Sequence, residues 1–103
     1  MLIIFVFCVN MLLQELNMEN AKKKMELYRV ILGQLLIEAR KEKGFSQQAV
    51  ADLAGISRVS VSYYERGERS INMDDLISLC DSCGFDYVQI IKKLQKSVSK
   101  MED

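Results

Sequence analysis

One segment constrains the fold of this chain more than any other: Ser46 to Gly67, with the sequence SQQAVADLAGISRVSVSYYERG. Ser46 and Ser57 each precede a run with helical patterning, and a serine hydroxyl can cap the free N–H groups at the start of a helix. Gly55 separates the two runs, and glycine adopts the left-handed conformation of a sharp helix exit without steric cost. The segment therefore predicts two short helices joined by a tight turn. Such a pair can place its second helix in the major groove of DNA.

The second predicted helix, from Ser57 to about Arg66, has few residues suited to a protein core. Val61 and Tyr64 lie three positions apart and can point inward, which leaves the other side chains outside. Arginine can bind guanine O6 and N7 with two hydrogen bonds, and a valine methyl group can contact the thymine methyl. The outward residues therefore suit contact with base edges: Arg58, Val59, Ser60, Ser62 and Tyr63.

This segment resembles the helix-turn-helix of the phage repressor and Cro family, also called the Xre family. The matching features are Ser46-Gln47, Ala51, Gly55, Ile56-Ser57, Val61 and Glu65-Arg66-Gly67. Their order and spacing are kept in a resemblance that extends from about Leu32 to Asp86. The resemblance implies an all-α fold: a compact five-helix, lambda-repressor-like DNA-binding domain, here with an extra N-terminal hydrophobic segment.

Composition agrees with an all-α domain. The chain has 103 residues, no proline, and no sustained alternation of apolar and polar residues beyond residue 20. Most glycines fall where helices should end, but Gly33 lies inside a helical pattern, where it predicts a mild cost in stability. We expect a helix-turn-helix domain over residues 25–103, preceded by an N-terminal extension over residues 1–24.

Charge is distributed unevenly, although the formal net charge is zero. Residues 40–69 contain six basic and four acidic side chains, whereas residues 70–91 contain four acidic and no basic ones. A modestly basic face opposite an acidic one fits a protein with one side on phosphates. We therefore expect modest, salt-sensitive non-specific affinity for DNA.

The N-terminal extension begins with an apolar run. Residues 2–9, LIIFVFCV, are uninterrupted, but the run is too short for a membrane span of about 20 residues and lacks the features of a signal peptide. It could lie upstream of the real start, since Met11, Met18 and Met25 are possible initiators. It could also be a hydrophobic arm that pairs with another chain, or a weak membrane anchor. We expect no stable membrane insertion.

The polar segment Asn17 to Lys24 predicts a hinge or the frayed start of a helix. Its three consecutive lysines, Lys22 to Lys24, could contact DNA phosphates, or they could simply form part of the solvated surface. At the other end of the chain, a capping residue at Asp86 predicts a final helix. The resemblance implies a homodimer contact on this helix, formed by the apolar stripe Tyr87, Ile91, Leu94 and Val98. A symmetric dimer would place two second helices about one DNA turn apart.

The resemblance also implies specific roles on DNA. The positions that it assigns to base edges are Arg58, Val59 and Tyr63, and the outward face of the second helix adds Ser62. Those expected near the DNA backbone are Gln47, Ser57, Ser60 and Arg66, and Gln47 should also brace the second helix. Tyr63 is bulkier than the small or amide residue expected at its position, so it could instead stack on a sugar or cover a thymine methyl group.

An ion pair between Arg40 and Glu65 is the structural contact that the resemblance implies. It would tie the second helix of the pair to the first helix of the domain. The alternative is two independent surface charges.

Catalysis and metal binding have little support. The chain has no histidine and no glycine-rich phosphate loop. Cys80 and Cys83 form a C-x-x-C at the C-terminal end of a predicted helix, where the helix dipole raises a thiol pKa. A zinc site would need two more ligands, and Cys8 is the one other cysteine. We expect no enzymatic activity, no bound metal and no cofactor. Three cysteines and no export signal predict a location in the reducing cytoplasm.

These patterns together predict sequence-specific binding of double-stranded DNA by a homodimeric transcriptional repressor. Two alternatives remain open. One is an antitoxin that binds a protein toxin and uses DNA binding for autoregulation. The other is an adaptor whose helix-turn-helix no longer binds DNA. The resemblance includes no effector, sensor or peptidase domain, so regulation would come from concentration, a partner or proteolysis.

Overall fold

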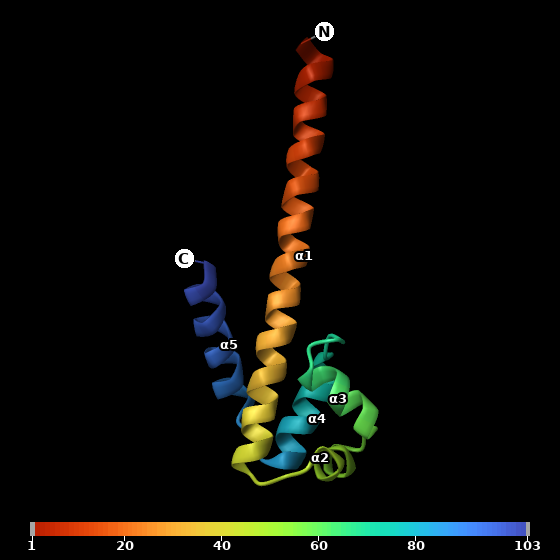
Figure 1. The fold of residues 1–103 in the computed structure, drawn as a ribbon, viewed down its shortest axis with the longest axis vertical. Helices are drawn as coiled ribbons and strands as arrows, with labels where there is room; N and C mark the ends of the chain where they lie inside the picture. The colour runs from red at the N-terminus through yellow and green to blue at the C-terminus, as the bar shows by residue number, and fades with distance from the viewer. Residues whose placement is uncertain (1, 103) are drawn as a thin grey trace.

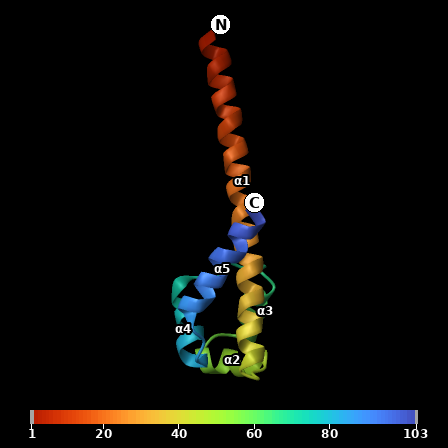
Figure 2. The ribbon, with the colours of Figure 1, turned by 90° about the vertical axis from the view of Figure 1, so that its left-hand side faces the viewer.

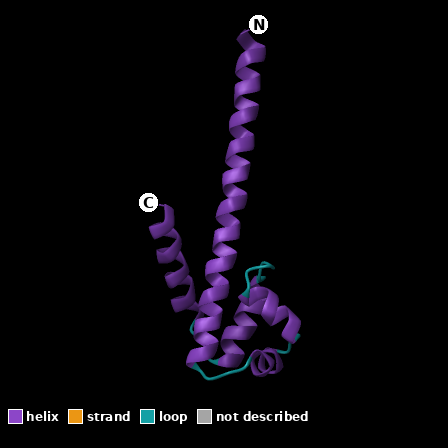
Figure 3. Cartoon of the chain, in the orientation of Figure 1, coloured by secondary structure: helices purple, strands orange, loops and turns teal. Residues whose placement is uncertain are grey.

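The structure is a computed structural model that describes residues 2–102, except for the side chains of residues 2, 5, 7, 13–19, 101 and 102. Within this range the chain forms five α-helices and no strand (Figure 3). The helices are α1 (Leu2–Glu42), α2 (Gln47–Ala54), α3 (Arg58–Glu65), α4 (Met73–Cys83) and α5 (Tyr87–Glu102). The predicted all-α, five-helix fold is confirmed. Residues 1 and 103, the outer ends of the two predicted segments, lie outside the described range.

The other helices gather around the C-terminal half of α1 (Figure 1). α5 and α3 both pack against α1, α2 packs against α3, and α4 packs against α2. The N-terminal half of α1 projects away from this body, as the view turned by a quarter also shows (Figure 2). The molecule is therefore elongated, with extents of 64 × 27 × 18 Å.

The prediction of a hinge or a frayed helix start over Asn17 to Lys24 is wrong. α1 continues without a break from Leu2 to Glu42, so the N-terminal extension is part of the same helix as the first helix of the domain. The physical reason is the absence of a signal that ends a helix, because no glycine or proline occurs before Gly33. Polar asparagine, glutamate and lysine change which face is apolar, but they do not break a helix.

The apolar side chains described on the projecting part of α1 are exposed. They are Ile3, Ile4, Val6, Val9, Met11 and Leu12. None of the described helices is long and apolar enough to cross a membrane. This finding concerns a full span only, so the pairing arm, the weak anchor and the upstream start all stay predictions.

One hydrophobic core joins all five helices. Its buried side chains are Ile31, Leu35, Leu36, Val50, Ala51, Val61, Tyr64, Leu76, Leu79, Cys80, Cys83, Phe85, Ile90 and Val98. Each large apolar side chain that is fully buried contributes about 1.5–3 kcal/mol. The buried set begins on α1 at Ile31, so the core rests on the C-terminal part of that helix.

The prediction that Val98 forms a dimer contact is wrong. Its side chain is 2% exposed and belongs to the core of its own chain. Ile90, Leu94 and Val98 recur at spacings of four, so they share the face of α5 that turns toward the core. Tyr87 and Ile91 lie on the neighbouring face and are 41% and 40% exposed.

Gly33 has a role that the helical pattern did not predict. A Cβ atom at this position would lie 2.7 Å from the carbonyl oxygen of Tyr64 and closer still to that of Glu65. Contacts of this length are far below normal van der Waals separation. Gly33 therefore lets α1 approach the backbone at the end of α3, and the predicted mild cost is offset by this close crossing.

We expect Gly33→Ala to lower the free energy of unfolding, although alanine is the better helix former by about 1 kcal/mol. Overpacking against a fixed backbone costs about 1–3 kcal/mol, and contacts this short with backbone atoms place the cost in the upper half of that range, which leaves a net loss of about 1–2 kcal/mol. Urea unfolding followed by circular dichroism measures the change, with Gln34→Ala at the exposed neighbouring position as the control. A Gly33→Ala chain as stable as the wild type would contradict the close crossing.

Candidate nucleic-acid interface

The turn between α2 and α3 forms as the sequence pattern predicts. The Ser46 hydroxyl accepts a hydrogen bond from the Ala49 N–H at 3.0 Å, which caps the start of α2. Gly55 has φ of 70°, in the left-handed region, and the following Ile56 N–H donates to the Ala51 carbonyl at 3.1 Å. These contacts fix the direction in which the chain leaves α2, and they position the start of α3.

Ser57 caps the N-terminus of α3. Its hydroxyl oxygen accepts from the Ser60 N–H at 3.0 Å, and the hydroxyl donates to the Ser60 Oγ at 2.9 Å. Ser57 and Ser60, both expected near the DNA backbone, are therefore joined to each other at the first turn of the helix. Val61 and Tyr64 are buried, as their spacing predicts.

The four residues expected to contact base edges lie on one face of α3. They occupy positions i, i+1, i+4 and i+5, which are neighbours on a helix surface. Arg58 is exposed and Val59 is 55% exposed, whereas Ser62 and Tyr63 are half-buried. The most accessible part of this face is therefore the first turn of α3.

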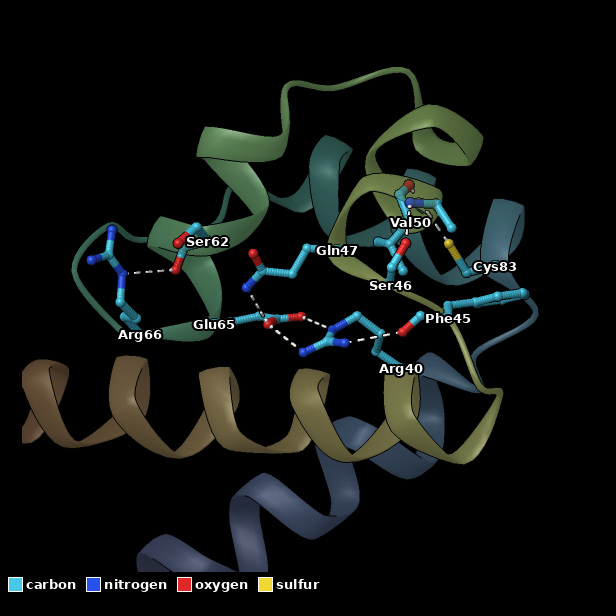
Figure 4. A network of polar contacts seen from close by, with 10 residues as sticks. Arg40, Phe45, Ser46, Gln47, Val50, Ser62, Glu65, Arg66 and Cys83 are labelled. Atoms are coloured by element: carbon cyan, nitrogen blue, oxygen red, sulfur yellow. Dashed lines mark hydrogen bonds and ion pairs between the residues drawn. The ribbon is translucent and has the colours of Figure 1, made fainter.

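The C-terminal end of α3 is held by a buried carboxylate (Figure 4). Arg40 on α1 donates from Nε to Glu65 Oε2 at 2.7 Å and from Nη2 to Glu65 Oε1 at 3.1 Å. Gln47, at the start of α2, donates from Nε2 to the same Oε1 at 2.9 Å. Arg40 Nη1 also donates to the Phe45 carbonyl at 3.0 Å. These contacts join α1, α2 and α3 through one side chain.

The Glu65 side chain is 4% exposed, so its charge has been removed from water. A buried charge is tolerated only where a partner charge and hydrogen bonds replace the lost solvation. Arg40 supplies a charge-assisted pair of hydrogen bonds, and Gln47 supplies a third donor. The alternative of two independent surface charges is therefore wrong. Gln47 also braces α3 through its contact with Glu65.

A second polar contact, between Tyr64 and Asp75, ties α3 to α4. The Tyr64 hydroxyl donates to Asp75 Oδ2 at 2.5 Å. This hydrogen bond raises the pKa of Tyr64, and burial adds to the rise, so the phenol stays a neutral donor. Sequence reasoning missed the contact because no helical spacing rule pairs residues of two different helices.

Two arginines lie over the ring of Tyr63. The Arg66 guanidinium carbon is 5.1 Å from the centre of the Tyr63 ring, and that of Arg69 is 4.9 Å away. Both distances are within the range of a cation–π interaction. Arg69 was not among the residues predicted for the site. The sequence feature that could have indicated Arg69 is its place as an arginine just after the second predicted helix.

The C-x-x-C cysteines lie inside the core, away from this surface. Burial raises the pKa of the Cys80 thiol to about 11 and also raises the pKa of Cys83. The Cys83 thiol donates to the Val50 carbonyl at 3.9 Å. Both cysteines therefore act as small core residues, and high thiol pKa values disfavour reactive thiolates. Within the described part of the chain, no group of three or more cysteine, aspartate or glutamate side chains could hold a metal ion.

A family model described as helix-turn-helix matches residues 36–90, which is more than half of the chain. This range contains the whole of α2, α3 and α4, the end of α1 and the start of α5. The chain therefore belongs to the helix-turn-helix family, of the Xre and Cro/C1 type.

Two curated relatives each match more than half of the chain. One is a protein of Thermococcus kodakarensis described as an HTH-type transcriptional regulatory protein, 45% identical over 53 residues, which are 52% of this chain and 17% of that protein. The other is an HTH-type transcriptional regulator of Sinorhizobium fredii, 30% identical over 63 residues, which are 61% of this chain and 82% of that protein. The chain thus spans less than a fifth of the first relative and most of the second.

Two solved structures resemble more than half of this chain. The restriction-modification controller protein C.AhdI from Aeromonas hydrophila has 33% identity and a TM-score of 0.57, over 59% of this chain and 92% of that one. The clp gene regulator ClgR from Corynebacterium glutamicum has 26% identity and a TM-score of 0.64, over 68% of this chain and 91% of that one.

We expect Arg40→Ala to lower the free energy of unfolding by about 3–5 kcal/mol, because it leaves the Glu65 carboxylate buried beside Gln47 alone. Chemical denaturation measures this change. The control is Arg66→Ala, which removes an ion pair with Glu68. The side chains of Arg66 and Glu68 are 54% and 50% exposed, so this pair should contribute less than about 1 kcal/mol to the free energy of unfolding. Equal losses in the two variants would show that the Glu65 network does not hold α3.

Proposed function

We propose that this chain is a DNA-binding transcriptional regulator that reads the major groove of double-stranded DNA with α3. The observation that carries the proposal is the two-sided character of α3. Val61, Tyr64 and Glu65 anchor one side of the helix in the body. The opposite side presents an exposed arginine and an exposed valine at the first turn.

The family and its described relatives support the coarse class of DNA-binding transcriptional regulator. Relatives of this chain are described as regulators of transcription, as a controller protein and as a gene regulator. Repression, as opposed to activation, stays a prediction from the sequence. Binding to chromosomal operators would place the action of the protein in the cytoplasm.

Arg58 and Val59 are the proposed base readers with the best access. The arginine side chain can bind guanine with two hydrogen bonds, and the valine methyl groups can contact thymine. Ser62 lies one turn later on the same face and is half-buried. Its short side chain suits a contact with a base edge that lies close to the helix. Ser57, Ser60 and Gln47 lie at the helix starts, where short polar side chains can contact the DNA backbone.

We propose that two copies associate through the exposed face of α5. Tyr87 and Ile91 are exposed apolar residues on this face, and Val88 beside them is 45% exposed. Leu94 is half-buried and borders the same face, whereas Val98 is not available. A two-fold dimer of this kind would bind a palindromic operator, with its half-sites one helical turn of DNA apart.

Selection of bound sequences from a random duplex pool tests the function. The full chain and a chain that starts at Met25 are compared at two salt concentrations. We expect both to enrich the same palindromic sequence, because the core begins at Ile31 and the match to the family begins at residue 36. Affinity should fall steeply as salt rises, since phosphate contacts release counterions.

Arg58→Ala is the informative variant in this experiment. It should lose about 1–3 kcal/mol of discrimination at one base pair of each half-site. Lys96→Ala, an exposed change on α5, is the control and should keep the selected sequence. Enrichment of no sequence by either length of chain would remove the DNA-binding proposal, and a non-palindromic consensus would remove the symmetric dimer.

A further inference from the structure

Tyr63 is at a position where the resemblance implies a base reader, but its ring already has partners. The guanidinium groups of Arg66 and Arg69 lie 5.1 and 4.9 Å from the ring centre. A guanidinium within about 6 Å of a ring centre is attracted to the negative face of the ring. The Tyr63 side chain is half-buried, whereas both arginines are exposed. The ring is therefore poorly placed to reach a base edge, and the charges that it holds face solvent.

The two arginines keep most of their hydrogen-bonding capacity free for a ligand. Arg66 uses Nε to donate to the Ser62 carbonyl at 3.3 Å, which directs its side chain along the end of α3. Its Nη2 forms an ion pair with Glu68 at 3.4 Å, with both side chains about half exposed. An exposed pair of this kind is weak, so a phosphate can replace the carboxylate. Guanidinium groups bind phosphate oxygens through paired hydrogen bonds.

We propose that Tyr63 is a positioning residue whose ring holds Arg66 and Arg69 together as a binding site for one phosphate of the DNA backbone. This inference rests on the proposed function, since it assigns a partner to the surface at the C-terminal end of α3. It replaces the predicted role of Tyr63 at a base edge, and it adds Arg69 to the interface. The ring reduces the freedom of two flexible side chains before DNA arrives, which favours binding.

A phosphate site and a base-reading site have different signatures in binding data. Every duplex carries the same phosphates, so loss of the site should weaken binding to all sequences by the same factor. Loss of a phosphate contact also reduces the dependence of affinity on salt. Loss of a base reader changes the preference at one base pair and leaves the others unchanged.

The test measures the dissociation constants of four proteins: wild type, Tyr63→Leu, Tyr63→Phe and Arg69→Ala. Each binds the duplex selected by the wild type and a set of duplexes with single base changes, over a range of salt concentrations. Tyr63→Leu should weaken binding to all duplexes by about five- to thirtyfold, the loss expected for two exposed cation–π contacts. Tyr63→Phe keeps the ring and should stay within about twofold of the wild type.

Arg69→Ala should reduce the slope of log affinity against log salt by about the amount that one phosphate contact contributes. Tyr63→Leu should weaken binding by a smaller factor in the Arg69→Ala background than in the wild type, because only its contact with Arg66 is then left to lose. Circular dichroism and thermal unfolding confirm that each variant is folded. If Tyr63→Leu unfolds the chain, Arg69→Ala and Tyr63→Phe still decide the question, since Arg69 is exposed.

Three results would overturn the inference. The first is an altered preference at a single base pair in Tyr63→Leu with an unchanged salt slope, which makes Tyr63 a base reader. The second is wild-type affinity and wild-type salt slope in Arg69→Ala. The third is a wild-type chain that shows no salt-dependent binding to DNA, in which case the proposed function and this inference both fail. In the first two results the proposed function stands.

Discussion

The arrangement of the body depends on one buried charge, the carboxylate of Glu65 at the end of α3. A carboxylate removed from water needs a partner charge and hydrogen bonds in fixed positions. Arg40 meets this need from α1, and Gln47 meets it from the start of α2. Because one side chain satisfies partners on two other helices, the angle of α3 is fixed relative to both. Gly33 makes the arrangement possible, since a larger residue would collide with the backbone beside Glu65.

This anchoring separates the structural side of α3 from the side proposed for DNA. The inner side has Val61 and Tyr64 in the core, and the Tyr64 hydroxyl adds a hydrogen bond to α4. The outer side carries the residues proposed for DNA. At its first turn it presents Arg58 and Val59, and at its far end Tyr63 gathers two arginines. In the proposed function, a rigid attachment of this kind aligns the base-reading and phosphate-binding groups on one helix.

The features that were predictable from sequence are the ones with local causes. Ser46, Ser57 and Gly55 act on backbone groups within a few residues, so the turn between α2 and α3 could be predicted from their order. The pairing of Arg40 with Glu65 could not be obtained from spacing, and it came from the resemblance to a family. The contact of Tyr64 with Asp75 and the close crossing at Gly33 depend on how helices pack, which no local pattern contains.

The errors have equally specific causes. The polar stretch over residues 17–24 predicts a hinge or a frayed helix start, but polarity without glycine or proline does not end a helix. The apolar stripe that ends at Val98 predicts a dimer contact there, yet the last turns of α5 also cover the core. The role of Tyr63 as a base reader stays a prediction, and nothing in the family pattern indicated that Arg69 would reach its ring.

The most direct measurement of the central claim is a map of amide chemical shifts in the isotope-labelled full chain, with and without the selected duplex. If α3 is the reading helix held by the Glu65 network, shifts should concentrate at residues 57–69 and at Gln47. The projecting part of α1 should change little. Shifts centred on α1 or α5, with α3 unchanged, would contradict the claim that this surface binds DNA.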